Sequence, residues 1–447
     1  MRSLVIVPEL TGRDSAAAGD NGKRSAIQHS IKDRLEEAVG LTRAIELTVA
    51  GTEIVRLANP RPATLFGTGK VAELGERIEE LDTGLVIIDH ALSPIQQRNL
   101  EREWNAKVLD RTGLILEIFG RRARTREGTL QVELAHLMFQ RSRLVRSWTH
   151  LERQRGGFGF LGGPGETQIE TDRRLLRDRI EKIRSELAKV TRTRTLHRSG
   201  RAKIPYPVVA IVGYTNAGKS TLFNKLTGAS VLSQDQVFAT LDPTMRELQL
   251  KSGRRVILSD TVGFISDLPT MLVAAFRATL EEVVAADIIL HVRDISHPES
   301  EAQCQDVVHV LDDLLEEPAA DAAPVVEVWN KIDLVDPDDL DDVEAARQQA
   351  INVGMPPILT SAATGQGLDE LSNVIDDIIG RGDVTLRIIV PAAAGRLRHW
   401  LHENATVLDA LTCDDDSGSS ELQVRISNAK HGQLLHQLET LGLAAEH

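Results

Sequence analysis

The chain has 447 residues and a formal net charge of −13, and a length of this order favours two to four domains over one compact core. Its two cysteines, Cys304 and Cys413, lie far apart and form no CxxC pair, which argues against a disulfide framework or a zinc site. No apolar run approaches the roughly 18 residues of a membrane span, and Pro8 and Glu9 interrupt the first apolar stretch, so the sequence predicts a soluble, cytoplasmic protein without a signal peptide, with peripheral membrane association left open.

Residues 1–120 alternate short apolar runs with helical patterns, as in Leu85–Ile88 followed by Pro94–Trp104. This alternation predicts a small α/β domain with a parallel sheet. The segment Gly67-Thr68-Gly69-Lys70 resembles part of a phosphate-binding loop, but the position of the required first glycine is Thr64, and Val71 follows the lysine. We therefore interpret the segment as a turn that opens a helix.

Residues 121–200 predict an antiparallel helical hairpin, with helices over 129–146 and 168–194 and a glycine-rich tip at 156–165. The second helix carries apolar residues at heptad spacing, which need an apolar partner. These residues are Ile169, Leu176, Ile180, Ile183, Leu187 and Val190. The preceding helix offers Leu130, Leu134 and Leu137 as that partner.

The hairpin segment is strongly basic. Between Arg121 and Lys203 there are 21 Lys and Arg residues against 9 Asp and Glu residues, whereas the chain as a whole is acidic. Such asymmetry indicates a segment that meets a polyanion. The alternative is a solvated helix face with i,i+4 ion pairs, such as Arg177 with Glu181.

Residues 207–380 contain the motif GxxxxGK[ST] at 213–220, between an apolar run at 208–212 and a helical pattern that begins at Thr221. This strand–loop–helix context is typical of a phosphate-binding loop. Its backbone N–H groups would surround phosphates, Lys219 would reach the terminal phosphates, and Ser220 would bind Mg²⁺. The predicted contacts are Gly213, Tyr214, Thr215, Asn216, Ala217, Gly218, Lys219, Ser220 and Thr221.

Two further segments complete the predicted phosphate and metal site. The motif DxxG at Asp260, Thr261, Val262 and Gly263 ends an apolar strand, so its Asp can hold Mg²⁺ through water and its Gly N–H can meet the γ-phosphate. A threonine between the two motifs completes the Mg²⁺ shell, and we favour Thr240 over Thr244. This segment supplies Phe238, Ala239, Thr240, Leu241 and Asp242.

The identity of the nucleotide's base is predicted from the motif NKxD at Asn330, Lys331, Ile332 and Asp333. This motif follows the apolar run 325–329. The Asp333 carboxylate accepts from guanine N1–H and its exocyclic amine, and adenine does not present that pattern. The loop Ser361, Ala362 and Ala363 fits a backbone N–H donor to guanine O6. The predicted ligands are therefore GTP or GDP with Mg²⁺.

The position after the DxxG glycine is Phe264, where many GTPases have a water-orienting glutamine. An apolar ring cannot orient water, so we expect slow basal hydrolysis that a partner stimulates. We assign catalytic contacts to Lys219, Thr240 and Gly263 and assign no general base. Loops on both sides of DxxG would be ordered by the γ-phosphate, which indicates a switch.

Residues 381–447 alternate strand and helix patterns and predict a small α+β domain without evident chemistry. The predicted fold class is thus α/β multidomain. It combines an N-terminal α/β domain with a helical hairpin, a P-loop GTPase domain with a mostly parallel sheet, and this C-terminal domain.

With these motifs in order, the chain resembles the HflX-type GTPases of the translation-factor-related class, in the Obg–HflX superfamily. The resemblance extends over nearly the whole length. The segments that match the family pattern in the nucleotide domain are GYTNAGKST, FATLDPT, DTVGFI, NKID and SAATG. Those in the N-terminal part and the hairpin are FGTGKVAEL and residues 110–116, 122–128, 130–135 and 163–168.

The resemblance implies binding to the 50S ribosomal subunit, with the hairpin 121–203 on 23S rRNA, and the dissociation or rescue of stalled or idle ribosomes. It also implies hydrolysis stimulated by the ribosome, and we expect a monomer. Two alternatives stay open. One is a GTP-gated binding module that acts on another RNA or protein. The other is an ATP-using RNA remodeller with a second nucleotide site in the N-terminal domain.

Overall fold

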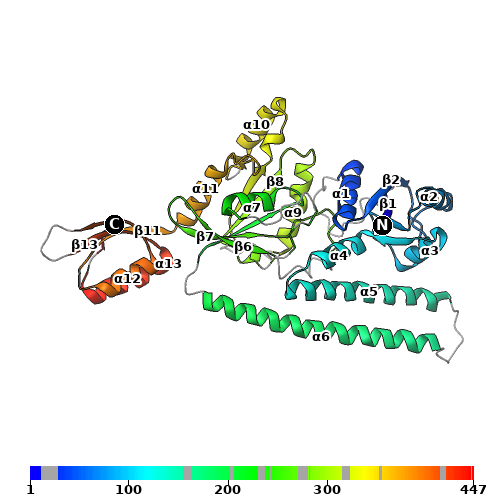
Figure 1. Ribbon diagram of the computed structural model, residues 1–447, viewed down its shortest axis with the longest axis horizontal. Coiled ribbons are helices and arrows are strands. Elements are labelled where there is room, and N and C mark those ends of the chain that lie inside the picture. Colours follow the sequence, from blue (N-terminus) through cyan, green and yellow to red (C-terminus); the bar gives the residue numbers. More distant parts are fainter. Residues whose placement is uncertain are drawn as a thin grey trace.

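The structure is a computed structural model of the 447-residue chain. It describes residues 1–11, 29–154, 164–201, 206–229, 237–238, 240–241, 243–269, 280, 282–314, 323–351, 355–412, 419–443 and 445–446. Most of the expected hairpin tip, residues 156–163, lies outside the described residues, as do the predicted nucleotide contacts Ala239 and Asp242. The described residues form three separate sheets, each with helices packed beside it, and a pair of long helices (Figure 1).

The N-terminal domain is a parallel α/β sheet. Its elements are β1 (Arg2–Leu10), α1 (Ile31–Ala44), β2 (Thr48–Leu57), α2 (Thr68–Glu80), β3 (Leu85–Ile88), α3 (Pro94–Trp104), β4 (Lys107–Asp110) and α4 (Arg111–Arg122). The strand order is β2-β1-β3-β4, with all pairings parallel. This order reverses the direction of winding between β1 and β3, whose carboxyl ends form the crevice where such sheets bind ligands.

Local sequence fixes the boundaries of α3 and α4. Ser93 and Gln96 form a capping box at the start of α3, and Asn105 ends the helix in the left-handed conformation. Asp110 is both the last residue of β4 and the N-cap of α4, accepting from the Gly113 N–H at 2.8 Å. The sequence patterns did not predict α4, because no loop separates it from β4.

The predicted hairpin is formed by α5 (Arg126–Gln154) and α6 (Pro164–Arg201), which run antiparallel along one side of the molecule (Figure 1). We call this pair the arm. In its seam, Leu130 of α5 and Ile180 and Ile183 of α6 are buried. An ion pair joins the arm across its face, from Arg179 Nη2 to Glu133 Oε1 at 2.5 Å.

The predicted GTPase domain has a six-stranded sheet in the order β10-β9-β8-β5-β7-β6, in which, among the described strands, only the edge strand β6 is antiparallel. Because β5 is central and buried on both faces, the loop that follows it lies at the middle of the carboxyl edge. The elements are β5 (Val208–Gly213), α7 (Lys219–Thr227), β6 (Thr244–Gln249), β7 (Arg255–Asp260), β8 (Ile288–Asp294), α9 (Ser300–Leu314), β9 (Val325–Asn330), η2 (Ile332–Leu334), η3 (Pro337–Asp339), α10 (Leu340–Ile351), β10 (Ile358–Leu359) and α11 (Leu368–Gly380).

The C-terminal domain consists of β11 (Asp383–Val390), α12 (Gly395–Asn404), β12 (Thr406–Thr412), β13 (Ser420–Ser427), α13 (Asn428–Leu441) and β14 (Ala445–Glu446). Its antiparallel sheet has the order β12-β13-β11-β14, the split β-α-β arrangement of ferredoxin-like folds. Arg254 of the GTPase domain donates to Asp376 and to Asp383, at the junction of the two domains. The predicted α/β multidomain fold class is confirmed.

The N-terminal and GTPase domains share one hydrophobic core. It joins Leu41 of α1 and Phe119 of α4 to Tyr214, Phe238 and Phe264 around the phosphate loop. Burial of large apolar side chains across this boundary favours a fixed arrangement of the two domains. The candidate nucleotide site is therefore built partly on the N-terminal domain.

Candidate guanine-nucleotide site

The loop between β5 and α7 has the backbone geometry of a phosphate-binding loop. Gly213 has a φ of 148°, and a Cβ there would collide with the Val292 carbonyl of the neighbouring strand. Gly218 has a φ of 95°, and a Cβ there would collide with the Asn330 side-chain amide. Only glycine fits either position without strain, so the two glycines of the motif are required by the fold itself.

Lys219 begins α7 with a buried side chain. Its Nζ donates to the Tyr214 carbonyl at 2.6 Å. Burial lowers the pKa of this ammonium to about 8, and the nearby Asp260 carboxylate opposes that shift. An anion placed at the loop would favour the charged form again. The lysine is therefore desolvated in advance for a phosphate.

Three oxygen-bearing side chains converge beside the loop. Ser220 Oγ donates to Asp260 Oδ2 at 2.7 Å, Thr240 Oγ1 donates to the same oxygen at 2.9 Å, and the two hydroxyls lie 3.0 Å apart. Asp260 Oδ1 is buried and has no hydrogen-bond partner among the described residues, and burial raises the pKa of this carboxyl. Hard oxygen ligands around a buried carboxylate fit Mg²⁺. Thr244 instead begins β6, opposite Asp260 in the ladder with β7.

The DxxG loop lies directly against the phosphate loop. The Thr215 N–H donates to the Phe264 carbonyl at 2.7 Å, and the Phe264 N–H donates to the Gly213 carbonyl at 3.1 Å. A Cβ on Gly263 would come within 2.9 Å of Lys219 Nζ. The glycine at this point lets the loop approach the lysine that would hold the terminal phosphates.

The NKxD segment meets the loop Ser361–Ala363, called the SAA loop, at the opposite end of the site. Asn330 is buried, with its Nδ2 donating to the Ala217 carbonyl at 2.8 Å and its Oδ1 accepting from the Ala362 N–H at 2.9 Å. It therefore braces the phosphate loop against the SAA loop. Asp333 is exposed on η2, where its carboxylate is accessible to a base.

The remaining predicted residues are distributed over the same loops. Lys331 has a φ of 66° and pairs its Nζ with Asp294 Oδ2 at 2.7 Å. Leu241 is buried in the shared core. The other predicted contacts lie on the phosphate loop and α7 (Asn216, Thr221), after β7 (Thr261, Val262), on η2 (Ile332) and on the SAA loop (Ser361, Ala363).

Sequence reasoning missed a polar network between the N-terminal domain and this site. The Tyr214 hydroxyl donates to Glu37 of α1 and accepts from the Ser266 N–H at 2.7 Å. Arg111 of α4 donates to the Ser266 carbonyl at 2.7 Å and also pairs with Glu37. Polarity at positions 37 and 111 gives no signal in the sequence, because the partners are far away along the chain.

Family models match three successive parts of the chain. "GTP-binding GTPase N-terminal" matches residues 32–120, "GTP-binding GTPase Middle Region" matches 122–201, and "50S ribosome-binding GTPase" matches 208–331. The "GTPase HflX" of Magnetococcus marinus is 50% identical over 412 residues, covering 92% of each chain. The "GTPase HflX" of Escherichia coli strain K12 is 46% identical over 372 residues, covering 82% of this chain and 83% of that protein. The chain belongs to the HflX family of GTPases.

Membership in the HflX family confirms the predictions of a GTPase and of guanine-nucleotide binding. Among solved structures, a GTP-binding protein from the archaeon Sulfolobus solfataricus in complex with GDP is 23% identical, with a TM-score of 0.44. That match covers 85% of this chain and 98% of the archaeal one. Among the helices built from described residues, none is long and apolar enough to cross a membrane.

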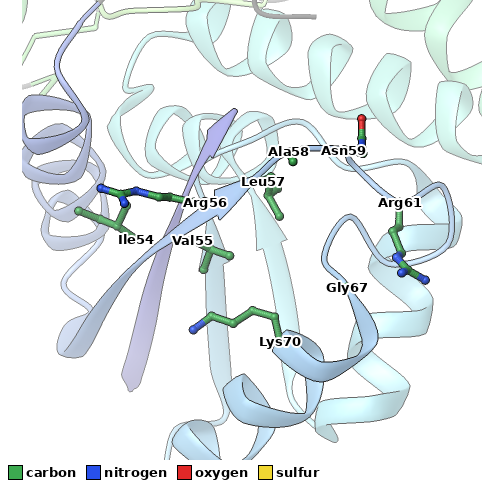
Figure 2. Close-up of a pocket in the computed structure, with 9 residues that line it drawn as sticks. All are labelled: Ile54, Val55, Arg56, Leu57, Ala58, Asn59, Arg61, Gly67 and Lys70. Atoms are coloured by element: carbon green, nitrogen blue, oxygen red, sulfur yellow. The ribbon is translucent and has the colours of Figure 1, made fainter. Parts of the chain in front are cut away.

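The GTGK segment of this HflX-family chain opens a helix, as the sequence indicates. Gly67 is the N-cap of α2, with a φ of −67°. Lys70 reaches from the first turn of α2 toward β2 and lines an open pocket of about 610 Å³ together with Arg56 and Arg61 (Figure 2). Lys70 Nζ already pairs with Glu73 at 2.6 Å. The segment has neither the enclosing loop nor the desolvated lysine of the site at 213–220.

Proposed function

We propose that this GTPase binds the 50S ribosomal subunit through its arm and acts in the dissociation or rescue of stalled or idle ribosomes, with the nucleotide controlling its attachment. The observation that carries the proposal is the arm itself. A basic helical hairpin of about 80 residues, matched by the "GTP-binding GTPase Middle Region" model, joins a domain matched by the "50S ribosome-binding GTPase" model. Ribosomal RNA is the polyanion that such a segment fits.

The exposed cations of the arm support an RNA partner. Along α6, the arginines at 174, 177, 179, 184 and 192 are exposed. Two of them form ion pairs of the kind that solvent screens strongly, Arg179 with Glu133 and Arg184 with Glu181. Phosphates can displace such weak partners and release counterions as they bind. Binding should therefore weaken steeply as the salt concentration rises.

In the proposed mechanism, the phosphate-loop amides and Lys219 hold the phosphates, and Asp333 accepts from guanine. Ser220 and Thr240 would bind Mg²⁺ directly and Asp260 would bind it through water; the ion would neutralise charge on the β- and γ-phosphates. The Gly263 N–H would meet the γ-phosphate. Phe264 cannot orient a water molecule, so basal hydrolysis is slow and the ribosome completes the site.

Cosedimentation with purified 50S subunits tests the proposal. We expect pelleting with a non-hydrolysable GTP analogue to exceed pelleting with GDP, and 50S subunits to stimulate GTP hydrolysis. Equal pelleting in all nucleotide states would argue against a switch. Absence of both pelleting and stimulation would favour a GTP-gated module that acts on another RNA or protein. ATP turnover that survives Lys219→Ala would favour an RNA remodeller with a second nucleotide site.

A further inference from the structure

Helix α4 lies between the arm and the nucleotide site. It begins at Arg111, directly after β4, and ends at Arg122, four residues before α5 begins. All but one of the residues from Arg111 to Phe119 are buried. A buried helix of three turns moves as a rigid body about 18 Å long. A displacement of one end of α4 therefore also moves its other end.

The N-terminal end of α4 holds the segment that follows DxxG. Arg111 Nη2 donates to the Ser266 carbonyl at 2.7 Å and to Ser266 Oγ at 2.9 Å. Ser266 is three residues after Gly263, which is the expected contact to the γ-phosphate. Arg111 is itself held by the carboxylates of Glu37 and Asp89. These contacts occupy the carboxyl edge of the N-terminal sheet, where folds of this topology usually bind a ligand.

The last turns of α4 hold the segment that precedes Thr240. The Phe119 ring meets the Phe238 ring edge-on, with centroids 4.7 Å apart and an interplanar angle of 75°. Phe238 is two residues before Thr240 and has a φ of 58°, a conformation that bulky residues rarely adopt. Such backbone conformations persist where packing enforces them. The contact with Phe119 supplies that packing.

The arm is tied to the same helix. Arg143 of α5 donates to Asp110 Oδ2 at 2.7 Å, while Asp110 Oδ1 caps α4 through the Gly113 N–H. The Arg143 guanidinium also lies 4.3 Å from the centroid of the Phe139 ring of α5. A movement of the arm can thus be transmitted to the first turn of α4 through the buried carboxylate of Asp110.

We propose that α4 couples the arm to both nucleotide-sensing loops, and that Arg111 and Phe119 are positioning residues for γ-phosphate recognition and hydrolysis. Both loops must adopt one geometry around the γ-phosphate, and both are fastened to one rigid helix. The triphosphate therefore selects one position of α4, and a partner that moves the arm changes hydrolysis through α4. This regulation rests on the proposed nucleotide-binding role of the site. Ribosome binding is needed only to test the link between the arm and α4.

A double-mutant cycle with Phe119→Leu and Ser266→Ala tests the coupling without ribosomes. We expect each change to weaken binding of a non-hydrolysable GTP analogue by about threefold to tenfold, the size of one lost ring contact or hydrogen bond. GDP affinity should change by less than about twofold, because GDP does not order the two loops. The combined variant should lose less than the product of the two effects, since either change alone releases α4. Additive effects, or equal losses for GDP, would overturn the proposal.

Matched controls separate positioning from simple loss of packing. Phe66→Leu makes the same change in the core of the N-terminal domain, and Ser3→Ala removes a buried hydroxyl that donates to the Thr48 carbonyl there. Both controls should leave the ratio of triphosphate to GDP affinity unchanged. If Phe119→Leu does not fold, it is replaced by Phe119→Met, whose flexible thioether side chain can fill the space and contact the Phe238 ring. A changed affinity ratio in the controls would show that any core defect suffices.

Arg143→Gln tests the link between the arm and α4. We expect cosedimentation with 50S subunits to stay at the wild-type level while stimulation of GTP hydrolysis falls by about tenfold, the effect of losing a hydrogen bond between charged groups. Arg141→Gln, the same charge change two residues earlier on α5, should retain full stimulation. Full stimulation in Arg143→Gln would overturn the link, and lost pelleting would make Arg143 an RNA contact instead. If the wild type does not bind 50S subunits, the proposed function fails. The double-mutant cycle measured with nucleotides alone still decides the role of α4.

Discussion

Two segments of this molecule place glycines and a lysine at the start of a helix, and the structure treats them differently. At 213–220 both glycines take positive φ values in contact with neighbouring strands, and Lys219 is buried. At 67–70, Gly67 has ordinary extended φ and ψ with open space around it, and Lys70 pairs with Glu73 at the surface. The two segments therefore differ in enclosure and desolvation, and these two properties favour 213–220 over 67–70 as the candidate phosphate site.

The largest expected effect comes from exchanging the two lysines for alanine. Lys219→Ala removes a desolvated charge from the phosphate position and should weaken GTP binding by about 100-fold or more. Lys70→Ala should leave GTP affinity within about twofold, because its partner is a solvated carboxylate. Calorimetric titration with GTP and Mg²⁺ measures both. Retained GTP binding in Lys219→Ala with loss in Lys70→Ala would reverse the comparison and place the nucleotide in the N-terminal domain.

Replacing the glycine before each lysine-bearing helix should also cost more at 213–220 than at 67–70. Gly218→Ala forces a side chain into the left-handed region and against the Asn330 amide, at a cost of about 1–3 kcal/mol. That cost should appear as a lower Tm and as GDP affinity reduced by about tenfold or more. In Gly67→Ala the new Cβ meets no atom of the described residues within 4 Å beyond its chain neighbours, and the change should cost less than about 1 kcal/mol. Thermal unfolding with and without GDP distinguishes them. Equal destabilisation would mean that enclosure is not what separates the two loops.

The predicted metal site adds to this contrast, because the lysine of the GTGK segment is followed by Val71, whose side chain has no oxygen. Ser220→Ala should weaken GTP binding in Mg²⁺ by about tenfold. In EDTA the variant and the wild type should bind GTP alike. Thr240→Ala should behave similarly toward the triphosphate, whereas Thr244→Ala, at the start of β6, should not. A stronger effect at Thr244 than at Thr240 would move the metal ligand to the rejected threonine.

The smallest expected effect is a pH dependence confined to the enclosed lysine. The pKa of Lys219 is about 8 in the free protein, and bound phosphate should raise it. Nucleotide then binds the protonated form, so affinity is full well below pH 8, is about halved at pH 8 and falls by about a further fivefold between pH 8 and pH 9. Calorimetry in buffers of different ionisation enthalpy should show proton uptake on binding near pH 8.5. Lys219→Arg should bind without proton uptake, and uptake in that variant would assign the proton to another group.

The order of motifs predicted which segments meet at the candidate nucleotide site, because each motif follows an apolar strand and parallel strands bring their carboxyl ends to one edge. Local signals also predicted α3, whose capping box and Pro94 mark its start. The same reasoning missed α4, which follows β4 without turn residues. It also did not anticipate that Asn330 braces two loops, since a side chain's partners depend on distant backbone.

The sequence alone determined the motif of the candidate phosphate loop, the NKxD segment after its strand and the helical pattern of the arm, because these depend on spacing within one short stretch of chain. Only the tertiary structure decided that Arg111 holds Ser266, 155 positions away, and that Phe119 meets Phe238. Contacts of that kind arise where two domains bury a common core, and a periodicity of 2 or 3.6 residues carries no information about which surfaces will meet.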